Sequence, residues 1–536
     1  MNEIAHKFHF LDMIAIAAYF LLMMAIGIYF ARRNRNTDDY FLGNRSIPGW
    51  ALGLSMMGAI ISSITFLALP AGAYALDWRM ILPNLMLPVS LLFAIFIFIP
   101  LFRAGISASA FEYLEMRYGS IARLYGAVSF IILQVLRIGM VLYLVALPLK
   151  IMLGVPMLWV ILVCGVITII YTASGGFEAV VWTDVIQAVI LLLGGVVCFT
   201  IILLKLPGGL GQVIDVGMQY KKFSFGEVEF NLLERTMLTM IITGTWAWIA
   251  QYSSDQNVVQ RYLAAPSLRE ARKATVLCAA TCIPTWFFFF FLGTCLFVYY
   301  KVNPSSIVQS MEGANENDGV LPYFIVTEIP AGIMGLIIAG VLAAAMSTLS
   351  AGINAISTVT VSDFFRRYLV PGRDEKFYLD LARYTSLCAG GLMIAFALIF
   401  WKLPKESMMD VNLIISAVFG GALSGLFLIG LFTRRVHNRA MLLGLGLAVA
   451  FNIYLMLDSM MNLIPSPFSL GVHAYWVALL VNILFMVSAY AASFVLKSDP
   501  KDIHGLTIWT IDKNGQAVDR KPRKATAPLE WAHGED

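Results

Sequence analysis

The sequence predicts an all-α protein that crosses a membrane many times. Of its 536 residues, 59% are hydrophobic and only 13% are charged, and the mean hydropathy is +0.79. So few charges cannot cover the surface of a soluble protein of this length. Apolar runs of about 20 residues also recur along the chain, and a helix of that length crosses roughly 30 Å of hydrocarbon.

The apolar runs, separated by polar breaks, predict about thirteen helices. They are expected near residues 11–31, 48–75, 80–103, 121–152, 155–174, 178–206, 236–262, 274–301, 330–362, 378–401, 410–432, 438–458 and 470–496. An odd number of crossings places the two chain ends on opposite sides of the membrane. The first run is too long for a signal peptide and ends in "ARRNR", so we expect it to be a retained helix.

Lysine and arginine in the short loops indicate the orientation, because such loops favour the cytoplasmic side. Basic residues gather in alternate loops at Arg32, Arg33, Arg35, Arg45, Arg269, Arg272, Lys273, Arg366, Arg367, Arg373, Lys376, Arg434, Arg435 and Arg439. The opposite loops at 302–320 and 459–469 contain none. We therefore expect a plasma-membrane protein (inner membrane in a Gram-negative cell) with its N-terminus outside and its C-terminal tail in the cytoplasm.

Two of the predicted helices look interrupted in corresponding places. The run 48–75 contains "SMMGAIISSITFLALPAGAYA", and the run 236–262 contains Thr243–Gly244–Thr245. Each run begins a block of five helices, and an odd count inserts the second block upside down relative to the first. Paired interrupted helices in inverted halves are typical of a transporter site.

The predicted helices and loops divide the chain into six parts. They are an N-terminal helix and cytoplasmic loop (1–47), a first inverted repeat (48–206), an outer loop (207–235), a second inverted repeat (236–432), two further helices (433–496) and a cytoplasmic tail (497–536).

Two ionisable residues within the predicted spans need an explanation, since each costs roughly 2.5–3.5 kcal/mol on insertion scales. Arg137 lies midway along its helix. It either forms an ion pair that locks two helices or acts as counter-charge to an anionic substrate, whose carboxylate a guanidinium binds bidentately. Asp184 lies nearer the cytoplasmic end of its helix. It either snorkels to the interface or pairs with a cytoplasmic base, or it serves as a cation ligand.

A hydroxyl cluster lies deep in a third apolar run, "GVLAAAMSTLSAGINA" at 340–355. A lone serine or threonine in a membrane helix usually bonds to the carbonyl one turn earlier. Ser347, Thr348 and Ser350, however, spread over more than one face. Together with carbonyls freed by an interrupted helix, they could bind a cation such as Na⁺. The small residues around them would admit a second backbone, for which "GAIISSITF" is the candidate.

The sequence contains little that would indicate a metalloprotein, an enzyme or a sensor. The six cysteines lie within or at the edge of apolar segments without histidine or acidic partners, as small structural hydrophobes do. The predicted spans contain no paired carboxylates, histidine cluster or nucleophile with a base, so we expect no enzyme. We also expect no nucleic-acid partner, and the tail has no room for the kinase domain of a sensor.

Several motifs together resemble the sodium:solute symporter family over residues 8–496. They are "DDYFLGNRSIPGWALGLS", "SSITFLALPA", "YTASGGFEAVVWTDVIQ", "DQNVVQRY" and "AAAMSTLSAGIN". The resemblance implies a leucine-transporter-like core of five plus five helices and sodium-driven symport by alternating access. Na⁺, a small solute and membrane lipid are the implied partners. Within the family, "SSITF", Arg137 and "WTDVIQ" are most similar to the bacterial sialic acid symporters.

The resemblance also implies two sodium sites. The principal site would use the carbonyls of Gly58, Ile61 and Ala344 with the hydroxyls of Ser347 and Thr348. The second would map onto Asp184, Ser347, Ser350 and Ala351. The family pattern has a hydroxyl residue where this chain has Ala351.

The substrate site implied by the resemblance contains Ser62, Thr65 and Arg137, with Arg137 holding a carboxylate. Two further positions fall at Met80 and Asn84, where the sialic acid symporters have an aromatic residue and a glutamine. The expected substrate is therefore sialic acid (N-acetylneuraminate) or a related sugar acid. A neutral sugar of the glucose or galactose type, or another small carboxylate, is the alternative. An unpaired Arg137 would disfavour the neutral sugar.

Overall fold

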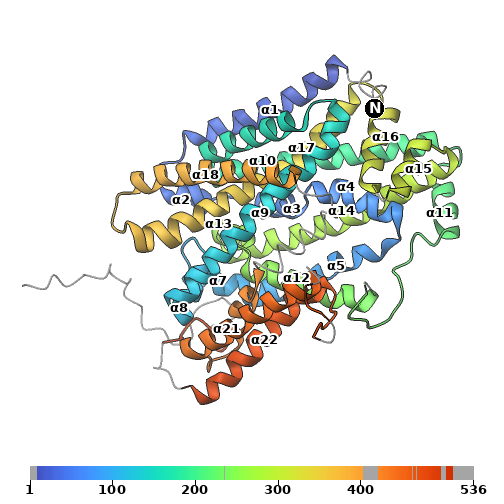
Figure 1. Ribbon diagram of the computed structural model, residues 1–536. Helices are drawn as coiled ribbons and strands as arrows, with labels where there is room; N and C mark the ends of the chain where they lie inside the picture. Colours follow the sequence, from blue (N-terminus) through green and yellow to red (C-terminus); the bar gives the residue numbers. More distant parts are fainter. Residues whose placement is uncertain are drawn as a thin grey trace, which may run out of the picture.

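The computed structural model describes residues 9–234, 236–314, 316–402, 420–460, 463–465, 468–496 and 502–510, and all regular elements within them are helices (Figure 1). The longer helices are α1 (Phe10–Ala31), α3 (Gly49–Ile60), α4 (Ser63–Ala75), α9 (Ser120–Leu153), α10 (Met157–Lys205), α12 (Met237–Ser254), α14 (Leu268–Val302), α17 (Ile333–Val359), α18 (Glu375–Lys402), α21 (Asn438–Leu455) and α22 (Ala474–Val495). Shorter ones are α2 (Thr37–Leu42), α5 (Leu82–Leu85), α6 (Leu87–Phe93), α7 (Ile99–Gly105), α8 (Phe111–Tyr118), α11 (Gly209–Gln219), α13 (Gln256–Ala264), α15 (Ser306–Gly313), α16 (Val320–Glu328) and α20 (Leu423–Phe432). Short 3-10 or π segments lie at Gly43–Arg45, Trp78–Ile81, Ala94–Phe98, Asn317–Gly319, Thr360–Leu369 and Met456–Met460.

Among the described residues, nine helices are long and apolar enough to cross a membrane, and the bent pair α3 and α4 adds a tenth. The chain is therefore a multi-pass membrane protein, as its composition predicts. The predicted number of thirteen helices stays a prediction, because residues 410–419 of the run 410–432 and most of the tail 497–536 lie outside the described residues.

The predicted helices 155–174 and 178–206 form one element, α10, which is broken at Gly176. At 1.5 Å per residue its 49 residues extend about 74 Å, roughly two and a half times the hydrocarbon thickness. Gly176 has φ +64°, which favours glycine, and a Cβ there would lie 2.8 Å from the Tyr40 carbonyl oxygen. The break thus falls where the sequence predicts a boundary, and glycine is the residue that permits it.

Both runs predicted to be interrupted are broken in the structure, but the second breaks at Asp255 and not at Thr243–Gly244–Thr245, which lies within the continuous helix α12. Helices α3 and α4 meet at a bend of 56°, and the Ser62 hydroxyl caps α4 by accepting a hydrogen bond from the Ile64 amide at 3.3 Å. Helix α12 ends before Asp255, whose carboxylate caps α13 by accepting from the Asn257 amide at 2.8 Å. Serine and aspartate are preferred N-caps, so the sequence itself encodes where the second half of each helix begins.

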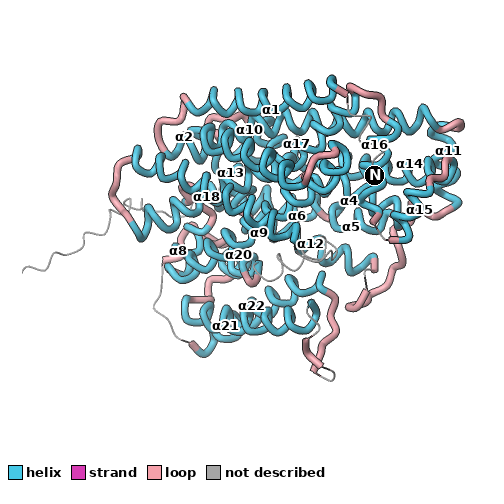
Figure 2. The backbone as a smooth tube through the Cα atoms, turned by 45° about the horizontal axis from the view of Figure 1, so that its top comes forward, coloured by secondary structure: helices cyan, strands magenta, loops and turns pink. Residues whose placement is uncertain are grey.

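Helix α17, which carries the hydroxyl cluster, lies at the centre of the bundle. Every residue from 337 to 359 is buried, and α10, α9 and α1 pack against it. Helices α21 and α22 lie side by side at the opposite edge of the molecule from α1 (Figure 2). The hydroxyls of α17 therefore face protein on all sides rather than lipid.

The basic loops predicted to share one side of the membrane do meet at one end of the bundle. The Thr37 hydroxyl donates to Glu375 at 2.6 Å, which joins the loop after α1 to the start of α18. The Gly49 amide donates to Glu270 at 2.8 Å, which joins the start of α3 to the first turn of α14. The predicted grouping of these loops is thus supported by direct contacts.

A charged network at the same end joins α8 to the segment after α17. Arg123 pairs with Glu115 at 2.5 Å and with Asp363 at 2.6 Å, and Arg367 pairs with Glu115 at 2.9 Å. Burial alone would raise the pKa of Glu115, but hydrogen bonds from Arg123 and Arg367 lower it below its ordinary value. The carboxylate is therefore ionised at neutral pH and holds these two segments together.

An unforeseen contact attaches α1 to the start of α17. Asp12 is fully buried, and its Oδ1 accepts hydrogen bonds from the Gly332 and Gly335 amides at 2.8 and 2.6 Å. Amides in the first turn of a helix lack partners within the helix and favour a negative charge. A Cβ on Gly335 would lie 2.5 Å from the Asp12 Cα, so this close approach requires glycine.

We expect Asp12→Ala to lower the stability of the folded protein by about 2–3 kcal/mol, because it removes a charged acceptor from two buried amides. Thermal unfolding in detergent measures the effect. Asp38→Ala is the matched control, since Asp38 is half exposed and forms a 3.8 Å surface pair with Arg45, worth at most about 1 kcal/mol. Equal shifts in the two variants would contradict the role given to Asp12.

Candidate functional site

The hydroxyl cluster of α17 contacts the end of α3, as the sequence predicts. The Ser347 hydroxyl donates to the Gly58 carbonyl at 2.8 Å and approaches the Ala344 carbonyl at 3.3 Å. Gly58 lies in the last turn of α3, where carbonyls lack amide partners within the helix. The interrupted helix thus presents free carbonyl oxygens directly to Ser347.

Four of the five residues expected at the principal sodium site line one small cavity: Gly58, Ile61, Ala344 and Ser347. Its volume of about 10 Å³ is close to the least that holds a single water molecule. The fifth residue, Thr348, lines a second cavity of similar size. The structure thus brings four of the five expected residues together and places Thr348 beside a different cavity.

Thr348 carries a buried oxygen that has no hydrogen-bond partner among the described residues. A buried polar atom without a protein partner is unfavourable, so a water molecule or an ion is expected beside it. Ser350 differs, because its hydroxyl donates to the Ser347 carbonyl at 3.1 Å. Thr348 is thus the hydroxyl in this cluster that is free to bind a ligand.

Asp184 forms an ion pair with a buried arginine. Its Oδ2 accepts from Arg261 at 3.0 Å and from the Ser55 hydroxyl at 2.6 Å, and both charged residues are fully buried. Arg261 lies on α13, so the pair joins α10 to the second interrupted helix. The first interpretation of Asp184, pairing with a base, is therefore confirmed.

The alternative role of Asp184 as a cation ligand keeps a structural basis, since its Oδ1 is buried and has no partner among the described residues. A Cβ on Gly58 would lie 3.4 Å from the Asp184 Cβ, which places this carboxylate next to the end of α3. Asp184 lines neither small cavity, however, and Ala351 lines the one that contains Thr348.

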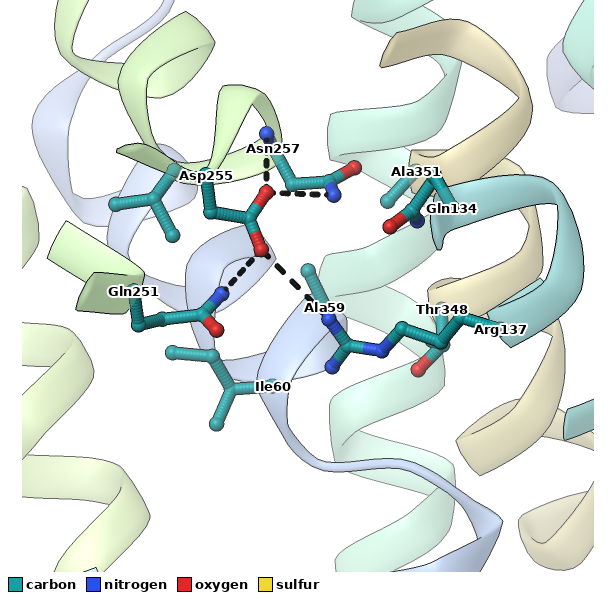
Figure 3. Close-up of a pocket in the computed structure, with 10 residues that line it drawn as sticks. Ala59, Ile60, Gln134, Arg137, Gln251, Asp255, Asn257, Thr348 and Ala351 are labelled. Carbon is teal, nitrogen blue, oxygen red and sulfur yellow. Dashed lines mark hydrogen bonds and ion pairs between the residues drawn. The ribbon is translucent and has the colours of Figure 1, made fainter. Parts of the chain in front are cut away.

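Arg137 faces the break between α12 and α13, where Asp255 is its partner (Figure 3). The Arg137 Nη1 and Asp255 Oδ2 atoms are 3.6 Å apart. Within the described part of the chain, Arg137 makes no other ion pair and no hydrogen bond. The interpretation of Arg137 as an ion pair that joins two helices is thus confirmed, yet most of its N–H groups remain available to a ligand.

A cavity of about 330 Å³ lies over Arg137, large enough for a small organic solute. It is lined mainly by α9, α12, α20 and α22, and its polar lining includes Gln134, Gln251, Ser424, Tyr475 and Asn482. Ser62, Thr65, Met80 and Asn84 are absent from its described lining, although Pro83, next to Asn84, contributes to it. Their role in substrate binding stays a prediction.

Two further charged residues belong to this site and were not predicted from the sequence, where only Arg137 and Asp184 were assigned to the interior of the spans. Asp255 and Arg261 also lie within the predicted run 236–262, and each pairs with one of those two. The sequence could have indicated them, because an ionisable residue within a membrane span is expected to have a charged or polar partner. Both residues belong to the motif "DQNVVQRY".

The fold and the site together define a secondary transporter that couples solute movement to a cation, with interrupted helices packed around a buried oxygen cluster. The model of the sodium:solute symporter family matches residues 40–447, and the chain belongs to this family. It is therefore a transporter and not an enzyme, and sodium is its coupling ion.

Individual relatives agree with this assignment. The sodium/sialic acid symporter NanT of Aliivibrio fischeri is 34% identical over 83% of this chain and 88% of its own length. The sodium/sialic acid symporter SiaT of Proteus mirabilis is 34% identical over 83% of this chain and 89% of its own length. The solved outward-open structure of a Na⁺-coupled sialic acid symporter is 29% identical, with a TM-score of 0.84 over 92% of this chain and all of that one.

Other solved structures share only the fold. The nucleobase-cation-symport-1 family transporter Mhp1 is 16% identical, with a TM-score of 0.56 over 86% of this chain and 96% of its own.

Proposed function

We propose that this transporter imports sialic acid (N-acetylneuraminate) or a related sugar acid together with Na⁺, by alternating access. The observation that carries the proposal is Arg137, whose guanidinium borders a 330 Å³ cavity with most of its donors unpaired. A carboxylate binds such a guanidinium bidentately. The names of the relatives that this chain resembles point to the same substrate class.

The ion pair between Arg137 and Asp255 removes one argument against a neutral sugar, namely that such a substrate would leave Arg137 unpaired. Because Arg137 has a carboxylate partner within the protein, a neutral substrate would not leave its charge uncompensated. The preference for an anion rests instead on the unpaired donors of Arg137. Another small carboxylate would use the same donors, so size and hydroxyl pattern separate it from a sugar acid.

The principal sodium ion would be held by carbonyls of Gly58, Ile61 and Ala344 and by hydroxyls of Ser347 and Thr348. The cavity that four of these residues line and the unpartnered oxygen of Thr348 support this assignment. Sodium bound there would join α3 to α17 and so stabilise one state of the alternating cycle by its higher affinity for that state.

A second sodium ion would use Asp184 Oδ1 with Ser347 and Ser350. Ala351 contributes no side-chain oxygen, so this site would have one ligand fewer than the family pattern. Two sodium ions with one sialate carry a net positive charge inward, which gains about 2.3 kcal/mol per 100 mV of membrane potential. One sodium ion with one sialate is neutral and gains nothing from the voltage.

The proposed topology follows the sequence. Residues 48–206 and 236–432 would form two inverted repeats, with the helix of 1–47 before them and the helices of 433–496 after them. The N-terminus would lie outside the plasma membrane, so the charged network around Arg123 and Arg367 would close the cytoplasmic side.

Uptake by purified protein in proteoliposomes tests the substrate. Labelled N-acetylneuraminate, glucose and pyruvate are compared with an inward sodium gradient and with an equal potassium gradient. We expect concentrative, sodium-dependent uptake of N-acetylneuraminate alone. Robust glucose uptake without uptake of N-acetylneuraminate would overturn the proposal and favour the neutral-sugar alternative.

We expect Ser350→Ala to reduce the charge moved per sialate from about +1 toward zero, because it weakens the second site and leaves the Asp184–Arg261 pair intact. Current and tracer uptake, measured together in the same vesicles, give this ratio. Ser357→Ala on the same helix is the control, since its hydroxyl donates to the Ala382 carbonyl. Electroneutral uptake by the unmodified protein would exclude the two-sodium version.

A further inference from the structure

The pocket around Arg137 already contains a carboxylate, and that carboxylate is held more firmly than its partner. Asp255 accepts hydrogen bonds from the Gln251 side chain at 2.6 Å and from the amide and side chain of Asn257, each at 2.8 Å (Figure 3). Arg137 has only the 3.6 Å ion pair with Asp255. The arginine is therefore free to reorient toward a ligand, and the aspartate is fixed.

The charges of the site balance before any ligand binds. Arg137 is compensated by Asp255, and Arg261 is compensated by Asp184. A substrate carboxylate that approaches Arg137 brings a second negative charge beside Asp255, with repulsion that a half-buried site screens poorly. The pocket therefore resists an anion that arrives alone.

A cation at the hydroxyl cluster would remove this resistance. Thr348 lines the same small cavity as Arg137 and Asp255, so one side of the proposed sodium site borders the ion pair (Figure 3). With sodium, the substrate carboxylate, Arg137 and Asp255 together, the local charges again sum to zero. Anion and cation would then each be bound more favourably in the presence of the other.

We propose that Asp255 is a positioning residue that makes substrate binding depend on sodium. It neutralises Arg137 in the empty pocket, so the arginine accepts a substrate carboxylate only when a sodium ion supplies the balancing charge. This inference rests on the proposed function and extends it, because it assigns part of the coupling to a residue outside both predicted sodium sites.

Neutral replacements of Asp255 test the idea without removing the helix cap. Asp255 caps α13 through its bond with the Asn257 amide, and asparagine and serine are equally good N-caps. Asp255→Asn and Asp255→Ser therefore remove the charge and keep the local structure. Asp255→Glu keeps the charge and is the matched control.

Binding of N-acetylneuraminate by the purified full-length protein is measured by calorimetry in sodium and in choline buffers. For the unmodified protein and Asp255→Glu we expect much weaker binding in choline than in sodium. For both neutral variants we expect the affinity in choline to rise at least tenfold over the unmodified protein, a gain that mere structural damage would not produce. No gain in either neutral variant would overturn the inference.

Sodium binding without any substrate gives an independent readout. The loss of a nearby negative charge should raise the sodium concentration needed for half-maximal thermal stabilisation at least threefold in Asp255→Asn and Asp255→Ser, but not in Asp255→Glu. Identical sodium curves in all variants would contradict the role of Asp255. If the unmodified protein binds sodium but no N-acetylneuraminate, the proposed substrate is wrong, and the sodium curves still decide the role of Asp255.

Discussion

Replacement of Thr348 with valine is expected to weaken sodium binding by about 2–3 kcal/mol, or roughly 30- to 150-fold, and to abolish sodium-driven uptake at ordinary sodium concentrations. Valine has nearly the shape of threonine, so the buried packing around α17 is kept. The change removes only the hydroxyl oxygen that has no protein partner. The expected loss is therefore a loss of a ligand and not of a structural hydrogen bond.

Sodium-dependent thermal stabilisation and uptake at graded sodium concentrations measure this effect. Thr168→Val is the matched control, because the Thr168 hydroxyl is buried on α10 and donates to the Cys164 carbonyl one turn earlier. Ser347→Ala should also abolish sodium dependence, but it additionally breaks the bond to the Gly58 carbonyl. Normal sodium dependence in Thr348→Val would remove Thr348 from the site.

Arg137→Gln is expected to raise the Kd for an anionic substrate at least 30-fold, because truncation of one partner of a charged pair costs about 2–5 kcal/mol. The glutamine keeps a hydrogen-bond donor but loses the charge and the bidentate fork. Sodium-dependent thermal stabilisation should persist in this variant, since Arg137 is not a proposed sodium ligand. Substrate binding and sodium binding would thus separate.

A double variant controls for structural damage in this experiment. Arg137→Gln leaves Asp255 without its cationic partner, and Asp255→Asn in the same chain restores a neutral pocket. The double variant should recover thermal stability without recovering affinity for the anion. If the double variant binds N-acetylneuraminate as tightly as the unmodified protein, Arg137 does not recognise the carboxylate.

The parts of the site that depend on local sequence were predictable. Ser62 and Asp255 are N-cap residues at the points where α4 and α13 begin, and both breaks fall within the runs judged to be interrupted. The spacing of Ser347 and Thr348 indicated two faces of one helix, and these residues line two different cavities. Periodicity and capping act over a few residues, so a single sequence is sufficient to expose them.

The partners of the buried charges could not be assigned in the same way. Arg137 and Asp255 lie far apart in the sequence, and so do Asp12 and Gly335. Such contacts depend on how the helices pack, and hydrophobic periodicity reports only which face of a helix is buried. The same is true of the cavity lining, because Tyr475 and Asn482 lie in a helix that carries no motif.

Coupled flux is the most direct test of the account, because it measures sodium and solute in one experiment. Proteoliposomes receive labelled sodium outside, with or without N-acetylneuraminate, and the entry of both species is followed under a clamped membrane potential. We expect N-acetylneuraminate to accelerate sodium entry in a fixed ratio, and we expect Thr348→Val to abolish this acceleration. Entry of N-acetylneuraminate that proceeds at the same rate without sodium would contradict this expectation.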